Sequence, residues 1–121
     1  MSGFRLKRIY DPPALADGRR VLVDRLWPRG VSKAKAQLDE WLKDVSPSHD
    51  LRQRTHAGEL DWEAFVAAYA AELAEEPARS AADRLIELAR EETVTLLFAA
   101  HDEAQNNAVA LKRWLEQRLM D

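Results

Sequence analysis

Hydrophobic positions along the chain predict three strands. Residues 4–10 form a short, imperfectly alternating apolar run that stops before Pro12 and Pro13. Residues 21–23 (Val-Leu-Val) end at Asp24, and residues 93–100 are apolar almost throughout. Such continuous apolar runs are typical of strands that are buried on both faces of a sheet.

The segments between these strands carry apolar residues at helical spacing. Ser32 can cap a helix over about residues 33–44. Residues 46–60 show no sustained period and predict a connection or a short irregular helix. Ser80 with Asp83 resembles a capping box that opens a later helix, and residues 106–120 predict a terminal one.

A stripe of apolar residues between positions 62 and 73 predicts a further helix, from Asp61 to near Pro77. Its aromatic residues Trp62, Phe65 and Tyr69 follow helical spacing. We interpret these three as core packing rather than as a platform for stacking bases.

This order of elements predicts a small α/β domain with a mainly parallel sheet flanked by helices, because strongly apolar strands alternate with helices. The 121 residues fit a single domain over positions 1–121. The chain has no cysteine, no signal-peptide pattern and no apolar stretch of membrane-spanning length. We therefore expect a cytoplasmic protein that does not associate with membranes.

Charge is unevenly distributed. Residues 1–60 carry 12 Lys and Arg against 8 Asp and Glu, whereas residues 61–121 carry 6 against 13, for an overall net charge of −3. Residues 1–35 alone hold 9 basic and 3 acidic residues. This excess indicates either a positive surface that attracts anions or a basic segment that only offsets the acidic helices.

In an open parallel sheet, ligands bind beyond the carboxyl ends of the strands, so the segment after residue 23 is the first place to look for a site. It contains Arg25 and Arg29, which can hold a carboxylate or phosphate, Trp27, which can stack on a base, and Ser32 at a helix start. The alternative is structural: Trp27 belongs to the core and Asp24 pairs with one of the arginines.

The segment after residue 100 is the second candidate. Asp102 with Gln105 matches a capping box, which is a purely structural role. Asn106 and Asn107 are poor helix formers at a helix start, so their amides either satisfy buried backbone groups or hold the polar edge of a ligand.

His101, Asp24 and Asp102 are the acid–base candidates if the protein catalyses a reaction, since imidazole titrates near neutral pH and carboxylates can orient it. We predict no metal site and no cofactor. His49 and His56 match no metal-binding spacing, two aspartates alone are a weak magnesium signal, and no P-loop, dinucleotide fingerprint or nucleophile elbow occurs.

The motif DRLWPRG at residues 24–30, with LDEWLK at 38–43, SPS at 46–48, DE at 102–103 and NNA at 106–108, resembles the YeaO-like family of small bacterial proteins, a domain of unknown function with family number 488. The resemblance covers nearly the whole chain. It implies an α/β fold and a cytoplasmic protein but no established activity. The family's motif positions fall on Asp24, Arg25, Trp27, Arg29, Trp41, Asp102, Asn106 and Asn107. The chain departs from the expected pattern at residues 53–58, where an aromatic residue is absent.

Three functions follow from these observations. The first is a polar pocket between residues 24–32 and 101–107 that binds, or binds and acts on, an anionic small molecule such as a nucleotide or a phosphorylated metabolite. The second is a nucleic-acid-associated accessory protein that uses the basic N-terminal region. The third is a scaffold that binds a protein partner without catalysis. The residues do not indicate an oligomeric state.

Overall fold

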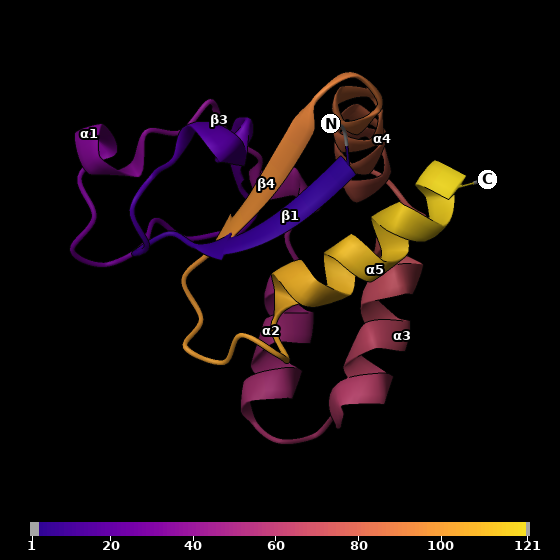
Figure 1. Ribbon diagram of the computed structural model, residues 1–121. Helices are drawn as coiled ribbons and strands as arrows, with labels where there is room; N and C mark the ends of the chain where they lie inside the picture. The colour runs from indigo at the N-terminus through magenta and orange to yellow at the C-terminus, as the bar shows by residue number, and fades with distance from the viewer. Residues whose placement is uncertain (1–2, 121) are drawn as a thin grey trace.

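Within residues 3–120, which the computed structural model describes, four strands form one parallel sheet in the order β1-β4-β2-β3 (Figure 1). The strands are β1 (Gly3–Arg8), β2 (Arg19–Leu22), β3 (Glu40–Trp41) and β4 (Thr93–Phe98). The predicted α/β fold with a mainly parallel sheet is confirmed. The short strand β3 at the edge was not expected.

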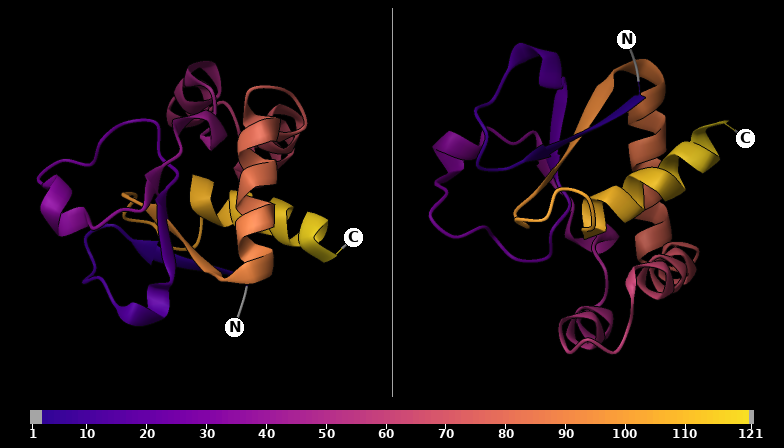
Figure 2. Two further views of the ribbon diagram at one scale, coloured as in Figure 1. Left: turned by 90° about the horizontal axis from the view of Figure 1, so that it is seen from above. Right: turned by 60° about the horizontal axis from the view of Figure 1, so that its bottom comes forward.

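The helices of the described chain are α1 (Lys33–Ala36), α2 (His49–His56), α3 (Trp62–Leu73), α4 (Ala78–Glu91) and α5 (Asn107–Met120), with short 3-10 turns η1 (Leu15–Asp17) and η2 (Lys43–Val45). All of the α-helices except α1 lie on one face of the sheet. Helices α4 and α5 contact the sheet, α3 contacts both of them, and α2 contacts α3. Figure 2 shows these helices on one side of the sheet and the α1 segment on the other.

The main core lies between the sheet and the helices. Side chains of a strand alternate between the two faces, and the fully buried Val21, Val94 and Leu96 point toward the helices. Leu85 of α4 and Leu111 of α5, also fully buried, complete this layer. The periodic apolar residues of both helices are therefore accounted for by packing.

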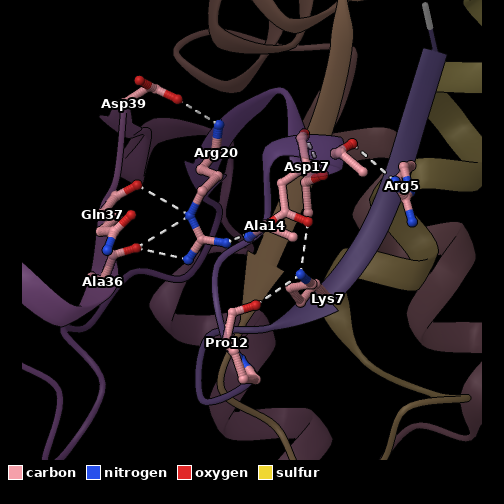
Figure 3. A network of polar contacts seen from close by, with 11 residues as sticks. Arg5, Lys7, Pro12, Ala14, Asp17, Arg20, Ala36, Gln37 and Asp39 are labelled. Carbon is pink, nitrogen blue, oxygen red and sulfur yellow. Dashed lines mark hydrogen bonds and ion pairs between the residues drawn. The ribbon is translucent and has the colours of Figure 1, made fainter. Parts of the chain in front are cut away.

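The other face of the sheet holds a small apolar cluster and a network of polar groups. The carboxylate of Asp17, a residue that is 1% exposed, forms ion pairs with Lys7 Nζ at 2.7 Å and with Arg20 Nη1 at 2.6 Å (Figure 3). The backbone carbonyl of Asp17 accepts a hydrogen bond from Thr95 Oγ1. Arg20 also donates to the carbonyl of Ala36 at 2.7 Å. We call this set the Asp17 network. It ties η1 and the α1 segment to the sheet.

The predicted helix over residues 33–44 is wrong beyond residue 36. Gln37 takes a left-handed conformation and Asp39 Oδ2 accepts the backbone N–H of Arg20 at 2.8 Å, which turns the chain into β3. The apolar residues at helical spacing there serve two cores. Leu38 packs in the small cluster, whereas Val45 packs in the main core on the opposite face.

Two other boundaries differ from expectation. Residues 49–56 form a regular helix capped by Ser48, where a connection or a short irregular helix was expected. Helix α4 begins at Ala78, because the backbone N–H and the hydroxyl of Ser80 both donate to the Glu76 carboxylate instead of starting a capping box. In the described part of the chain, no helix is long and apolar enough to cross a membrane.

Candidate functional site

A cavity of about 490 Å³ opens where β2 and β4 end, at the carboxyl edge of the sheet. We call it the edge cavity. It is lined by residues 24–27, Pro47, Arg52, Thr55, His56, residues 60–62, Phe65, Ala99, Ala100, Asp102 and residues 105–107. The two segments predicted from the sequence do meet here, together with α2 and the start of α3.

Asp24 joins the two strand ends. Its Oδ2 accepts the N–H of Ala99 at 2.9 Å and its Oδ1 accepts Asn107 Nδ2 at 3.0 Å, while its backbone carbonyl accepts Trp41 Nε1 at 2.8 Å. Burial raises the pKa of Asp24, and the hydrogen bonds from Asn107 and Ala99 and the charge of Arg52 offset only part of this rise. Asp24 therefore links the ends of β2 and β4 to the start of α5 and also lines the edge cavity.

The paired asparagines are explained mostly by backbone groups. Asn106 is buried, and its side chain donates to the Asp102 carbonyl at 2.8 Å and accepts the N–H of Val109 at 2.9 Å, which caps α5. Asn107 Nδ2 donates to the Val23 carbonyl at 3.2 Å as well as to Asp24. Within residues 3–120, Asn107 Oδ1 accepts no hydrogen bond, so it is the amide oxygen of the pair that a ligand can use.

The two arginines of the 24–32 segment do not converge. Arg25 lines the edge cavity, half-buried, and donates long hydrogen bonds to the carbonyls of Pro47 and Ser46 at 3.3 and 3.4 Å. Arg29 is exposed and does not line the cavity. Within residues 3–120, neither Arg25 nor Arg29 forms an ion pair with Asp24, so that part of the structural alternative is wrong. The other part holds to the extent that Trp27 packs against the small apolar cluster.

Trp27 and Ser32 have local partners. Trp27 lines the edge cavity, but its Nε1 donates to the Val31 carbonyl at 2.6 Å and its ring meets that of Trp41 edge-on, with centroids 5.3 Å apart. Ser32 is exposed outside the cavity and caps α1 by accepting the N–H of Lys35 at 3.1 Å. Trp27 therefore forms a fixed wall of the cavity, and Ser32 lies away from it.

The acid–base candidates after β4 are separated. His101 is exposed and does not line the edge cavity. Asp102 lines it, but its Oδ1 accepts the N–H groups of Gln105 and Ala104 at 3.0 and 2.8 Å, which lower the pKa of Asp102. The predicted capping box is wrong, because these bonds close a turn and α5 begins later, at Asn107. No group of three metal-binding side chains occurs in the described residues.

Helix α2 contributes cavity-lining residues that were not predicted from the sequence. Arg52, Thr55 and His56 stand at i, i+3 and i+4, so they share one face of this helix, and all three line the edge cavity. No hydrogen bond or ion pair engages the Arg52 guanidinium within the part of the chain that is described. Its charge offsets a small part of the rise that burial causes in the pKa of Asp24, which lines the same cavity. The i, i+3, i+4 spacing was visible in the sequence, but residues 46–60 were not assigned to a regular helix.

The start of α3 contributes an aromatic wall. Phe65 and Tyr69 are buried, as predicted for core residues, but Trp62 is only half-buried. The rings of Trp62 and Phe65 stack with centroids 5.8 Å apart and an angle of 26° between their planes, and both line the edge cavity. The interpretation of these aromatic residues as packing alone is incomplete.

Known proteins resemble this chain along nearly its full length. "Uncharacterized protein YeaO" of Escherichia coli K12 is 44% identical over 109 residues, which cover 90% of this chain and 93% of that protein. "Uncharacterized protein Rv3073c" of Mycobacterium tuberculosis H37Rv is 34% identical over 114 residues, 94% of each chain. No solved structure matches significantly. A family model described as "Inactive DUF488-N3 subclade" matches residues 3–121. The chain therefore belongs to the DUF488 family, within the N3 subclade described as inactive.

Proposed function

We propose that the edge cavity binds a small anionic molecule without transforming it. The observation that carries this proposal is Arg52, a guanidinium that lines the cavity and has no partner among the described residues. Arginine presents a planar fork of N–H donors that fits a carboxylate or a phosphate. An unpaired cation in a partly desolvated cavity is a natural binding point for an anion.

Other side chains of the edge cavity also favour anion binding beside Arg52. Arg25 forms only long hydrogen bonds with carbonyl groups, so a charged acceptor can compete for it, and His56 follows Arg52 by one helical turn. Asp61 and Asp102 also line the cavity, and one oxygen of each carboxylate accepts backbone N–H groups at the start of a helix or turn: Ala64 for Asp61, Ala104 and Gln105 for Asp102. These two carboxylates therefore have a structural role, and the guanidinium groups are the ones that can bind an anion.

Binding without turnover is supported by the separation of the acid–base candidates. His101 is outside the cavity, and both carboxylate oxygens of Asp24 accept hydrogen bonds from the protein. General acid–base catalysis requires a group positioned to exchange a proton with the ligand. The description of the matching subclade as inactive agrees with this reading.

Calorimetric titration of the purified protein with inorganic phosphate, ribose 5-phosphate and nucleoside monophosphates at low ionic strength tests the proposal. We expect at least one to bind, and Arg52→Met to weaken that binding about tenfold or more, because it removes a charge-assisted hydrogen bond. The matched control is Arg54→Met on the same helix, since Arg54 is exposed, pairs with Glu59 at 3.5 Å and does not line the cavity. Failure of all these anions to bind, or equal losses in both variants, contradicts the proposal.

A second candidate function is contact with a nucleic-acid backbone through residues 25–38, the basic segment. Most N-terminal cations are engaged within the protein: Lys7 and Arg20 with Asp17, and Arg19 with Glu92. The basic segment contains four cations and no acidic residue. Three of these cations are exposed, namely Arg29, Lys33 and Lys35.

Binding of a labelled DNA duplex at increasing salt concentration tests this second candidate. Three phosphate contacts predict that the logarithm of the affinity falls with the logarithm of salt at a slope of about −2.7. Replacing the three exposed cations by glutamine should abolish the binding, while Arg52→Met should leave it unchanged. Absence of binding at low salt rules the candidate out.

A further inference from the structure

Resting on the proposed function, we infer that the ligand of the edge cavity is a nucleoside monophosphate whose base carries an exocyclic amino group. Three sides of the cavity carry different chemistry. Helix α2 supplies the cationic Arg52, α3 supplies the aromatic Trp62, and α5 supplies the free amide oxygen of Asn107. A phosphate, a flat ring and a hydrogen-bond donor in one molecule match these three groups.

The aromatic side indicates a ring in the ligand. Trp62 is half-buried although it belongs to the stripe that packs against the core, and Phe65 stacks on it at 5.8 Å. This backing fixes the indole so that a second ring can stack without ordering it further. A base stacked on an aromatic side chain gains binding free energy that a phosphorylated sugar cannot obtain, since it has no π-face.

The free oxygen of Asn107 indicates a donor on that ring. The orientation of the amide follows from its partners: Nδ2 donates both to the Val23 carbonyl and to the Asp24 carboxylate, which only accept. The oxygen must therefore point elsewhere. In the described chain no buried side-chain oxygen or nitrogen lacks a partner, so Asn107 Oδ1, which has none, is open to solvent at the cavity.

The phosphate end follows from the guanidinium groups. Arg52 and Arg25 line the edge cavity together, and a phosphate monoester carries between one and two negative charges near neutral pH. A volume of about 490 Å³ also lies within the range of cavities that hold one small ligand. These features favour a mononucleotide over a free base or a nucleoside.

Two matched pairs of nucleotides test the inference by calorimetry on the unmodified protein. Cytidine and uridine monophosphates differ by an amino group in place of a carbonyl oxygen, as do adenosine and inosine monophosphates. We expect the amino-bearing member of at least one pair to bind about tenfold more tightly, because a carbonyl oxygen would face Asn107 Oδ1 and leave both acceptors unpaired. It should also bind about tenfold more tightly than ribose 5-phosphate.

A substitution of the aromatic wall separates the ring from the phosphate. Trp62→Leu should weaken the preferred nucleotide about tenfold but leave ribose 5-phosphate unchanged. The control is Trp114→Leu, because Trp114 lies on α5 under the Arg118 guanidinium and outside the edge cavity.

The outcomes distinguish the two levels of proposal. The inference is overturned, while anion binding stands, if ribose 5-phosphate binds as tightly as every nucleotide. It is also overturned if the amino-bearing nucleotide binds no more tightly than its counterpart in both pairs. If none of the phosphates binds, the proposed function itself fails. If Trp62→Leu does not fold, the comparison of the matched pairs on the unmodified protein still decides the question.

Discussion

Replacing Arg20 by methionine removes the central cation of the Asp17 network while keeping most of the aliphatic stem. Arg20 is 5% exposed, and its guanidinium binds Asp17 at 2.6 Å and the carbonyls of Ala36 and Gln37 at 2.7 and 3.1 Å. The substitution leaves those two carbonyl groups without this donor. Asp17 keeps its ion pair with Lys7 at 2.7 Å, so its buried carboxylate still has a cationic partner.

These contacts determine how much unfolding free energy Arg20→Met should lose. Removing one partner of a buried ion pair costs about 3 to 5 kcal/mol, and the remaining Lys7 places Arg20→Met at the lower end, about 3 kcal/mol. For a domain of this length, 1 kcal/mol changes the melting temperature by about 4 °C, so we expect a decrease of roughly 12 °C. This is a large part of the stability of a typical domain, which is about 5 to 15 kcal/mol.

Urea unfolding followed by tryptophan fluorescence measures the effect, with Arg19→Met as the control. Arg19 is adjacent in sequence, but its ion pair with Glu92 at 3.2 Å is partly exposed, with side chains 33% and 40% accessible. Such a pair contributes less than about 1 kcal/mol. A loss below 1 kcal/mol for Arg20→Met, or equal losses in the two variants, would refute the assignment of the Asp17 network as the anchor of η1 and the α1 segment.

The pH dependence of the same experiment provides a second check. Burial alone would raise the pKa of Asp17, but the hydrogen bonds from Lys7, Ala14 N–H and Arg20 outweigh it and lower the pKa below its ordinary value. The stabilisation is therefore complete above the ordinary carboxyl pKa and is lost as the pH falls through the lower folded value. The difference between the unmodified protein and Arg20→Met should shrink over that acidic range.

Three further substitutions test other parts of the fold. Gly18→Ala should destabilise by more than about 1 kcal/mol in thermal unfolding, because Gly18 has a φ of +63° and a Cβ would collide with the Thr93 carbonyl; an unchanged melting temperature would contradict this. Tyr69→Phe should cost about 1 to 3 kcal/mol in urea unfolding, because the buried hydroxyl donates to the Val45 carbonyl, and a neutral result would show that water replaces the donor. Asp24 has a raised pKa through burial, so its folded state binds the proton more tightly and stability falls as the pH rises from the ordinary to the raised value. Asp24→Asn should lack this fall, and parallel stability profiles would speak against it.

The long helices could be predicted from sequence because the apolar stripe of each faces one core, as in the stripe that begins at Trp62. Strand β4 could be predicted because both of its faces are buried, which gives a continuous apolar run. The segment after Ser32 follows neither pattern. Its apolar residues split between the two faces of the sheet, and the helix gives way to a chain direction in which the Asp39 carboxylate accepts the N–H of Arg20, 19 residues away. Local periodicity carries no information about such a contact.

The candidate site was predicted in part for the same reason. Residues that follow β2 and β4 meet at the sheet edge, as the topology requires, so Asp24, Arg25 and Asn107 were found. Arg52 comes from a helix whose approach to that edge depends on how α2 packs on α3, which is a tertiary property. Arg29 was included because it lies close in sequence to Arg25, but the turn between them directs it away from the cavity.

The position of β4 in the sheet has a consequence for synthesis on the ribosome. β4 lies between β1 and β2, which form no ladder with each other, so every strand pairing except the short one between β2 and β3 waits for residues 93–98. The nascent chain must therefore hold β1 without a partner until residues 93–98 have been translated. Pairing over such long sequence separations is slow, since loop closure precedes the gain in contacts. During that interval the apolar side chains of β1 and β2 lack the cover that β4 gives them in the folded protein, and exposed apolar side chains and unpaired strand edges favour non-native association.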